Sequence, residues 1–134
     1  MKGKTVLVIE DDDMNMKLVR TLLKLGDFKV LEATDAEKGI AAAREHRPDL
    51  ILMDLQLPGM DGLSATRILR EDTTLVDLPI VALTAFAMQG DNEKAFDAGC
   101  IGYVTKPIDT RSFLKTISGF INSDRDETTP QVKA

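Results

Sequence analysis

Residues 50–59 read Leu-Ile-Leu-Met-Asp-Leu-Gln-Leu-Pro-Gly, passing from a wholly apolar run to an acid and then to a turn. A short run that is apolar at every position is typical of a strand covered on both faces, as in a parallel sheet flanked by helices. Asp54 directly follows this run, and Pro58-Gly59 marks a turn. The stretch therefore predicts a buried strand that presents a carboxylate at its carboxyl end.

Four other apolar runs share this character and predict further strands. They are Thr5–Ile9, Phe28–Leu31, Ile80–Leu83 and Ile101–Val104. Helical patterns lie between the runs. They cover Met14–Leu25, a segment from Thr34-Asp35-Ala36-Glu37 to just before Pro48, Asp61–Arg70, Met88–Ala98 and Asp109–Ile121. This alternation predicts an α/β fold with a doubly wound five-stranded parallel sheet flanked by five helices.

The length and composition indicate one domain. The chain has 134 residues, of which 43% are hydrophobic and 29% charged, as in ordinary globular proteins. We predict a folded domain over residues 1–122. The polar stretch 123–134 is expected to form a disordered C-terminal tail.

Charge and cysteine content limit the possible partners and location. The net charge of −5 disfavours binding to nucleic acid or to an anionic membrane surface. The apolar run near the N-terminus is too short for a signal peptide, no apolar stretch is long enough to cross a membrane, and Cys100 is the only cysteine. We therefore expect a cytoplasmic protein that acts through other proteins.

Acidic residues follow two of the predicted strands. Glu10 and Asp11 come directly after Thr5–Ile9, and Asp54 comes directly after Leu50–Met53. In the common strand order 2-1-3-4-5 these two strands are neighbours, so the three carboxylates would converge where ligands bind to open parallel sheets. Grouped carboxylates repel one another unless a cation lies between them, and Mg²⁺ prefers oxygen ligands of this kind. The next residues, Asp12 and Asp13, are better explained as capping the first helix.

Four sequence blocks, spread from about Lys4 to Ile121, resemble the receiver domains of response regulators, the CheY-like superfamily. The blocks are Val8-Ile9-Glu10-Asp11-Asp12, Pro48–Asp54 with Leu57–Gly62, Leu83-Thr84-Ala85 and Tyr103-Val104-Thr105-Lys106-Pro107. Within that family, Thr84–Asp91 and Gly99-Cys100 look most similar to stand-alone regulators of the DivK type and to receivers of hybrid histidine kinases.

The resemblance implies a phosphoryl-accepting site. Asp54 would be the phosphoacceptor, with Asp11 and Asp54 ligating Mg²⁺, or Mn²⁺ in its place, and Glu10 reaching the ion through water. Gln56 would contribute its backbone carbonyl. Thr84 and Lys106 would each contact a phosphoryl oxygen, as expected for a reaction catalysed by positioning and charge neutralisation.

Further roles follow from the same resemblance. The Lys106-Pro107 bond would be cis, Thr84 and Tyr103 would couple the site to an output face, and Gln56 and Phe86 would tune the lifetime of the phosphorylated form. Because Phe86 is bulky and offers no base, we expect slow self-hydrolysis. The chain would thus be a signalling phosphoacceptor that assists its own phosphorylation and dephosphorylation, not an enzyme acting on a separate substrate.

The resemblance also implies protein partners. A histidine kinase or histidine phosphotransfer domain would donate the phosphoryl group. A protein effector, for example a kinase, would recognise the phosphorylated form. The protein would be a monomer or a weak phosphorylation-dependent dimer.

Alternative functions are open at this point. There are four of them. The first is an intermediate carrier in a phosphorelay, and the second is a phosphatase of the haloacid-dehalogenase class. The third is a flavodoxin-like protein that binds a nucleotide or flavin, and the fourth is a pseudo-receiver that only docks to other proteins. The phosphatase alternative is disfavoured because that class needs Asp-x-Asp, and Asp54-Leu55-Gln56 lacks the second acid. The flavodoxin-like alternative is disfavoured because the sequence has no glycine motif that would cradle a phosphate. A pseudo-receiver would not need the acidic and cationic site residues, all of which are present.

Overall fold

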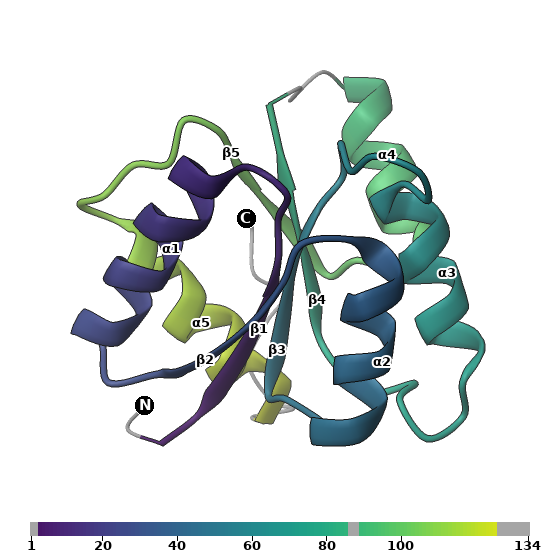
Figure 1. Cartoon of the computed structure of the whole chain (residues 1–134), viewed down its shortest axis with the longest axis horizontal. Coiled ribbons are helices and arrows are strands. Elements are labelled where there is room, and N and C mark those ends of the chain that lie inside the picture. Colours follow the sequence, from purple (N-terminus) through teal and green to yellow (C-terminus); the bar gives the residue numbers. More distant parts are fainter. Residues whose placement is uncertain (1–2, 86–88, 126–134) are drawn as a thin grey trace.

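The strands form one parallel sheet in the predicted order. The computed structural model describes residues 3–85 and 89–125, without the side chains of residues 89–92 and 122–125. The strands are β1 (Thr5–Ile9), β2 (Lys29–Ala33), β3 (Leu50–Asp54), β4 (Ile80–Thr84) and β5 (Gly102–Thr105). Their order is β2-β1-β3-β4-β5, which confirms the doubly wound α/β fold (Figure 1).

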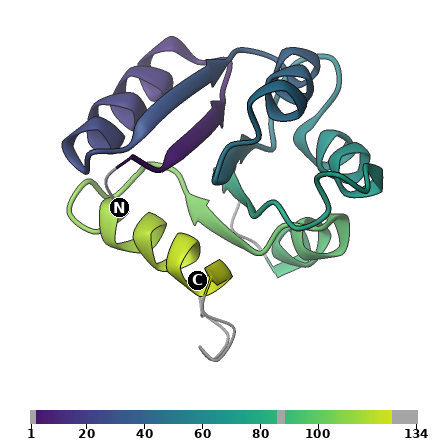
Figure 2. The ribbon, with the colours of Figure 1, turned by 90° about the horizontal axis from the view of Figure 1, so that it is seen from below.

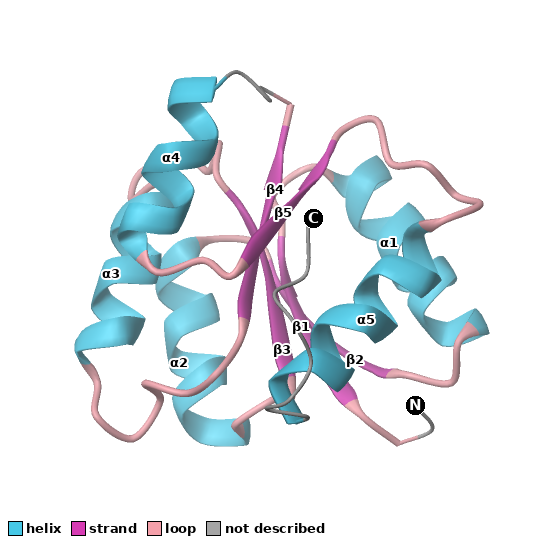
Figure 3. Ribbon diagram, turned by 180° about the vertical axis from the view of Figure 1, so that it is seen from behind, coloured by secondary structure: helices cyan, strands magenta, loops and turns pink. Residues whose placement is uncertain are grey.

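Helices cover both faces of this sheet. They are α1 (Asp13–Leu25), α2 (Ala36–His46), α3 (Gly62–Glu71), α4 (Gln89–Ala98) and α5 (Phe113–Arg125). Helices α1 and α5 lie on one face, and α2, α3 and α4 lie on the other, so the sheet is the middle layer of three (Figure 2). Figure 3 shows β4 and β5 side by side between the two helical layers.

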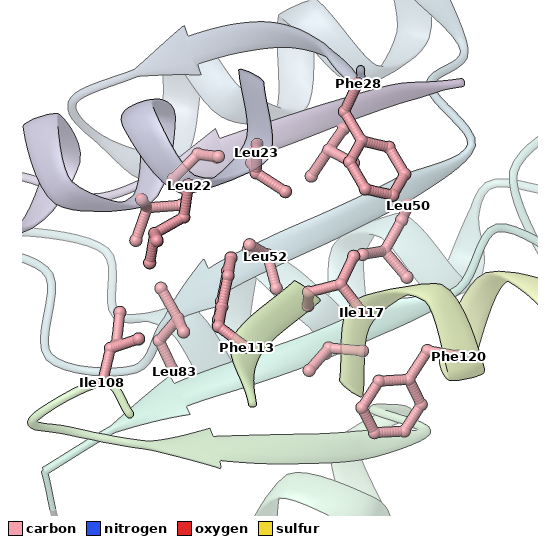
Figure 4. Packing of buried hydrophobic residues seen from close by; sticks show 14 of the residues in the cluster. Leu22, Leu23, Phe28, Leu50, Leu52, Leu83, Ile108, Phe113, Ile117 and Phe120 are labelled. Carbon is pink, nitrogen blue, oxygen red and sulfur yellow. The ribbon is translucent and has the colours of Figure 1, made fainter. Parts of the chain in front are cut away.

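A separate hydrophobic cluster fills each side of the sheet. Under α1 and α5, side chains such as Leu23, Leu52 and Phe113 pack together (Figure 4). Under α2, α3 and α4, the cluster includes Ile51 and Leu69. Every residue of β3 and β4 is buried, which confirms that the continuous apolar runs belong to strands covered on both faces.

Some element boundaries differ from the sequence predictions. Strand β2 begins at Lys29 because the Phe28 N–H donates to Leu23 O and so closes the end of α1 instead of entering the sheet. Helix α5 begins at Phe113, four residues later than predicted, because the Asp109 carboxylate accepts from Arg111 N and holds residues 110–112 in a turn. The helix then continues to Arg125, past the predicted start of the tail at residue 123, and residues 126–134 lie outside the described part.

Aspartates begin three of the helices. Asp12 caps α1 by accepting from Asn15 N, as predicted, and Asp61 caps α3 by accepting from Ser64 N. The cap of α2 is Asp35, one residue later than the Thr34-Glu37 spacing indicated. Among the described residues, no helix combines the length and apolar character needed to cross a bilayer.

Candidate functional site

Three carboxylates meet at the carboxyl ends of β1 and β3. The two strands are paired with Ile9 opposite Met53, so the residues that follow, Glu10 and Asp54, lie side by side. One carboxylate oxygen from each of Glu10, Asp11 and Asp54 lies within 4.8 Å of the others. Glu10 and Asp54 are each only 1% exposed, whereas Asp11 is exposed. The structure thus brings together the acids that the sequence analysis grouped.

Lys106 joins this cluster from the loop after β5. Its Nζ lies 3.1 Å from Glu10 Oε1 and 3.2 Å from Asp54 Oδ2. The Lys106-Pro107 bond is cis, and Lys106 N donates to Thr84 O, which ties this loop to the end of β4. The ammonium therefore lies where it can neutralise an anion held at Asp54.

Backbone N–H groups hold the outer sides of the two buried carboxylates. Asp12 N donates to Glu10 Oε2 at 3.1 Å, and Gln56 N donates to Asp54 Oδ1 at 2.9 Å. Glu10 Oε1 is buried and, although close to the Lys106 ammonium, receives no well-directed hydrogen bond from any described residue. Glu10 Oε1 therefore lacks the hydrogen bond that would offset its burial.

The pKa values reflect this crowding. Burial raises the pKa of Glu10 to about 7, and its contact with the Asp54 carboxylate adds to the effect. Burial alone would lower the pKa of Lys106, but its close contact with the Glu10 carboxylate and the charge of Asp54 outweigh burial and raise it. A proton on Glu10 is one way to relieve the repulsion, and a bound cation is the other.

The donor set fits Mg²⁺. The ion prefers a few carboxylate oxygens and retains several waters, and the exposed Asp11 leaves one side of the cluster open to solvent. Glu10 Oε1 is buried and receives no well-directed hydrogen bond from any described residue, so it is open to a water held by such an ion. The sequence analysis assigns a further ligand, the Gln56 backbone carbonyl, which stays a prediction.

Thr84 and Gln56 lie beside the acids at the neighbouring strand. Thr84 ends β4 and is 2% exposed, one position beyond the residue paired with Asp54. The Gln56 side chain reaches across, its Nε2 donating to Thr84 Oγ1 at 3.5 Å and its Oε1 accepting from Ala85 N at 3.5 Å. This bridge was not foreseen from the sequence, because side-chain direction at an exposed loop position has no pattern that reports it.

The predicted output residue Tyr103 lies on β5, away from the acids. It is half-buried and pairs with Ala82 across the β4–β5 ladder. Its ring meets that of Phe96 on α4 edge to face, with centroids 6.3 Å apart. Phe86, the predicted lifetime residue, lies outside the described residues.

Gly62 also supports the site, although the sequence analysis gave it no role. A Cβ built there would lie 2.4 Å from Asp54 O and 2.8 Å from Leu55 Cα. Only glycine therefore lets α3 begin so close to the backbone that carries Asp54. The available signal was its place directly after the capping acid Asp61, at the start of a helix that follows the Asp54 turn.

Cys100 is not part of the site. It is buried, its Sγ lies 4.0 Å from Thr66 Oγ1, and burial raises the pKa of its thiol to about 11. A thiol in this state is not a reactive nucleophile at neutral pH, so Cys100 acts as a small packed residue.

Comparison with known proteins gives consistent matches. Residues 6–118 match the family model described as response regulator receiver domain. The polar-differentiation response regulator DivK of Brucella anthropi is 42% identical over 118 residues, covering 88% of this chain and 96% of the relative.

Two solved structures are also similar. The receiver domain of the sensor histidine kinase PA1611 from Pseudomonas aeruginosa, with magnesium coordinated in its active-site cleft, has a TM-score of 0.84 and 35% identity, over 90% of this chain and 99% of that one. The receiver of Ssk1, solved with the phosphotransfer protein Ypd1 of Saccharomyces cerevisiae, has a TM-score of 0.84 and 28% identity, with 91% of each chain covered.

Proposed function

The chain belongs to the response regulator receiver family and is a signalling protein of the two-component type, and from this premise we propose that Asp54 is its phosphoacceptor. One observation carries the proposal: Glu10, Asp11, Asp54 and Lys106 converge at one edge of the sheet. Asp54 is the acid of this group whose strand is paired with β4, and it therefore lies beside the Thr84 hydroxyl as well as the Lys106 ammonium.

The reaction is transfer of a phosphoryl group from a phosphohistidine donor. A carboxylate oxygen of Asp54 attacks phosphorus, the new P–O bond forms as the P–N bond breaks, and the donor imidazole leaves. The Lys106 ammonium balances charge on the phosphoryl oxygens, and the Thr84 hydroxyl donates to another of them. The protein assists its own phosphorylation through these groups, and hydrolysis of the acyl phosphate restores Asp54.

The cofactor proposed is Mg²⁺, for which Mn²⁺ can substitute. Asp11, Asp54 and the Gln56 carbonyl would hold it, with Glu10 acting through water. When bound, it supplies positive charge to the transferring phosphoryl group. The buried Glu10 Oε1, which receives no well-directed hydrogen bond from any described residue, supports this assignment.

Signalling needs a second state that the phosphoryl group favours. Thr84 contacting that group would leave space for Tyr103 to turn inward, which would break its edge-to-face contact with Phe96. The output face is then α4, β5 and α5, and the phosphoryl group biases a pre-existing equilibrium. Gln56 and Phe86 would set how long that state lasts, with slow hydrolysis expected.

The proposed partners are proteins. A histidine kinase or histidine phosphotransfer domain donates the phosphoryl group, and the similar Ssk1 receiver, solved in complex with the phosphotransfer protein Ypd1, supports this. A protein effector, for example a kinase, binds the output face. The protein works in the cytoplasm as a monomer or as a weak phosphorylation-dependent dimer. Its similarity to DivK over 96% of that protein supports a regulator of the same stand-alone type.

The test is phosphorylation by a small donor. The protein is incubated with acetyl phosphate and Mg²⁺, and intact mass is measured. We expect one acid-stable, base-labile phosphoryl adduct, which Asp54→Asn abolishes and chelation of the metal prevents. An adduct that persists in Asp54→Asn would contradict the assignment.

Assays of phosphoester turnover and flavin binding, run beside the adduct measurement, separate the alternatives. Multiple turnover of a phosphoester without a stable adduct would indicate a phosphatase, and tight flavin binding would indicate a flavodoxin-like binder. A folded protein that forms no adduct under any condition would be a pseudo-receiver.

A further inference from the structure

The Gln56 side chain occupies a position between the phosphoacceptor loop and the end of β4. Its amide carries both a donor and an acceptor, and both are used: Nε2 toward Thr84 Oγ1 and Oε1 toward Ala85 N, each at 3.5 Å. The orientation of the amide is fixed by chemistry, because a backbone N–H can only donate and must therefore face Oε1. One side chain thus spans two adjacent polar groups beside Asp54.

These two groups are suited to an anion. A hydroxyl and a backbone N–H that point to one place can both donate to a phosphoryl oxygen, and Thr84 is assigned that role in the proposed function. In the resting protein the Gln56 amide contacts both of them. The Ala85 N–H has one hydrogen to donate, so a phosphoryl group on Asp54 that recruits it must displace Gln56 Oε1. The Thr84 hydroxyl accepts from Gln56 Nε2 and can still donate to a phosphoryl oxygen, so this contact holds the amide in place without blocking that role.

Displacement is feasible because of where Gln56 lies. The residue is exposed, so its amide can leave for water without being buried elsewhere. Its backbone is fixed independently, since Gln56 N donates to Asp54 Oδ1 at 2.9 Å. The side chain can therefore leave while the backbone keeps Asp54 in place.

We propose that the Gln56 amide is a resting-state latch that competes with the phosphoryl group for the Ala85 N–H and is held in place by its contact with the Thr84 hydroxyl. This inference rests on the proposed function and adds regulation to it: the latch opposes switching before phosphorylation, which is separate from any effect on hydrolysis afterwards. Because both contacts are long, its influence on phosphoryl binding is about threefold to tenfold, the range of a weak neutral hydrogen bond or two.

The test uses Gln56→Met, which keeps the length and backbone of Gln56 and removes the amide. The probe is beryllofluoride with Mg²⁺, a mimic of a phosphoryl group on a carboxylate, titrated against the full chain. We expect about threefold to tenfold tighter binding to Gln56→Met than to the wild type. In a Thr84→Val background the same substitution should bring a smaller gain, since the Gln56 amide is then held by only one of its two contacts.

A second readout is amide hydrogen exchange without probe or metal. The Ala85 amide should exchange faster in Gln56→Met, whereas the amides of Leu55 and Lys106, which donate to Leu83 O and Thr84 O, should be unchanged. A general loosening of the loops would accelerate all three amides and would overturn the latch.

The remaining outcomes are also decisive. Equal or weaker beryllofluoride binding by Gln56→Met overturns the latch while leaving the phosphoacceptor assignment intact. If the wild type neither binds beryllofluoride nor forms the acetyl phosphate adduct, the proposed function fails and the latch fails with it.

Discussion

The two ends of the central sheet handle buried polar groups in opposite ways. At the amino ends of β4 and β5, Arg70 of α3 donates to the carbonyl oxygens of Val76, Leu78 and Gly99 at 2.6–2.9 Å. At the carboxyl ends, three acids gather and two of them, Glu10 and Asp54, share one ammonium, while Glu10 Oε1 lacks a well-directed hydrogen bond from any described residue.

The difference shows how one fold can be both stable and reactive. The Arg70 guanidinium is always charged, and its N–H groups donate to the three carbonyl oxygens. The hydrogen bonds at that end of the sheet therefore form without a ligand. The other end concentrates like charges out of water, which costs stability until a cation or phosphoryl group arrives. Stability is therefore concentrated away from the site.

Removing the arginine should have the largest effect. Arg70→Ala leaves three carbonyl oxygens without this donor, and we expect the free energy of unfolding to fall by about 3 kcal/mol. Urea denaturation measures it. Arg67→Ala, on the exposed side of the same helix, is the matched control and should change little. Equal effects of the two substitutions would mean that the amino ends do not depend on these hydrogen bonds.

The close approach of α3 to Asp54 gives the next effect. Gly62→Ala places a methyl group against Asp54 O and Leu55 Cα, so we expect a loss of about 2 kcal/mol in stability together with weaker Mg²⁺ binding. Gly119→Ala on α5 meets nothing within 4 Å and should be neutral or stabilising, by up to about 1 kcal/mol. Unaltered Mg²⁺ affinity in Gly62→Ala would separate Gly62 from the site.

Neutralising an acid at the reactive end should change stability in the opposite direction. Without divalent cation, Asp54→Asn relieves repulsion with Glu10 and Asp11, and we expect the free energy of unfolding to rise by about 1 kcal/mol. With saturating Mg²⁺ the gain should shrink or reverse, because the wild type then gains more from the ion. A loss of stability in the metal-free variant would show that the pairing of Asp54 with Lys106 outweighs the repulsion.

The reactive end of the sheet could be predicted from the sequence, but the hydrogen bonds of Arg70 at the other end could not. The apolar run before Asp54 is buried at every position, and such runs identify covered parallel strands well. The convergence of Glu10, Asp11 and Asp54 then depends on strand order, which follows from the fold type. These features could be predicted because they rest on periodicity and on positions at strand ends.

Features that depend on side-chain direction could not be predicted. Arg70 and Gln56 look like ordinary polar residues, and only the structure shows that each one bridges two segments. The start of α5 was set four residues early because Asp109 begins a turn with the same residue types that begin a helix. Gly62 has a signal in its position, but the close approach that requires it is tertiary.

The central claim is that buried acids at the reactive end await a cation, and the pH dependence of Mg²⁺ binding tests it most directly. The pKa of Glu10 is raised from 4.5 to about 7, so its neutral form stabilises the metal-free fold fully below pH 4.5, and this contribution is lost as pH rises through 7. Binding of the ion requires the charged form, so titration calorimetry should show affinity falling from about pH 8 to about pH 6, by at most tenfold per unit, with proton release.

Glu10→Gln should remove most of that dependence. Equal wild-type affinity at about pH 8 and about pH 6, with no proton released, would contradict the account.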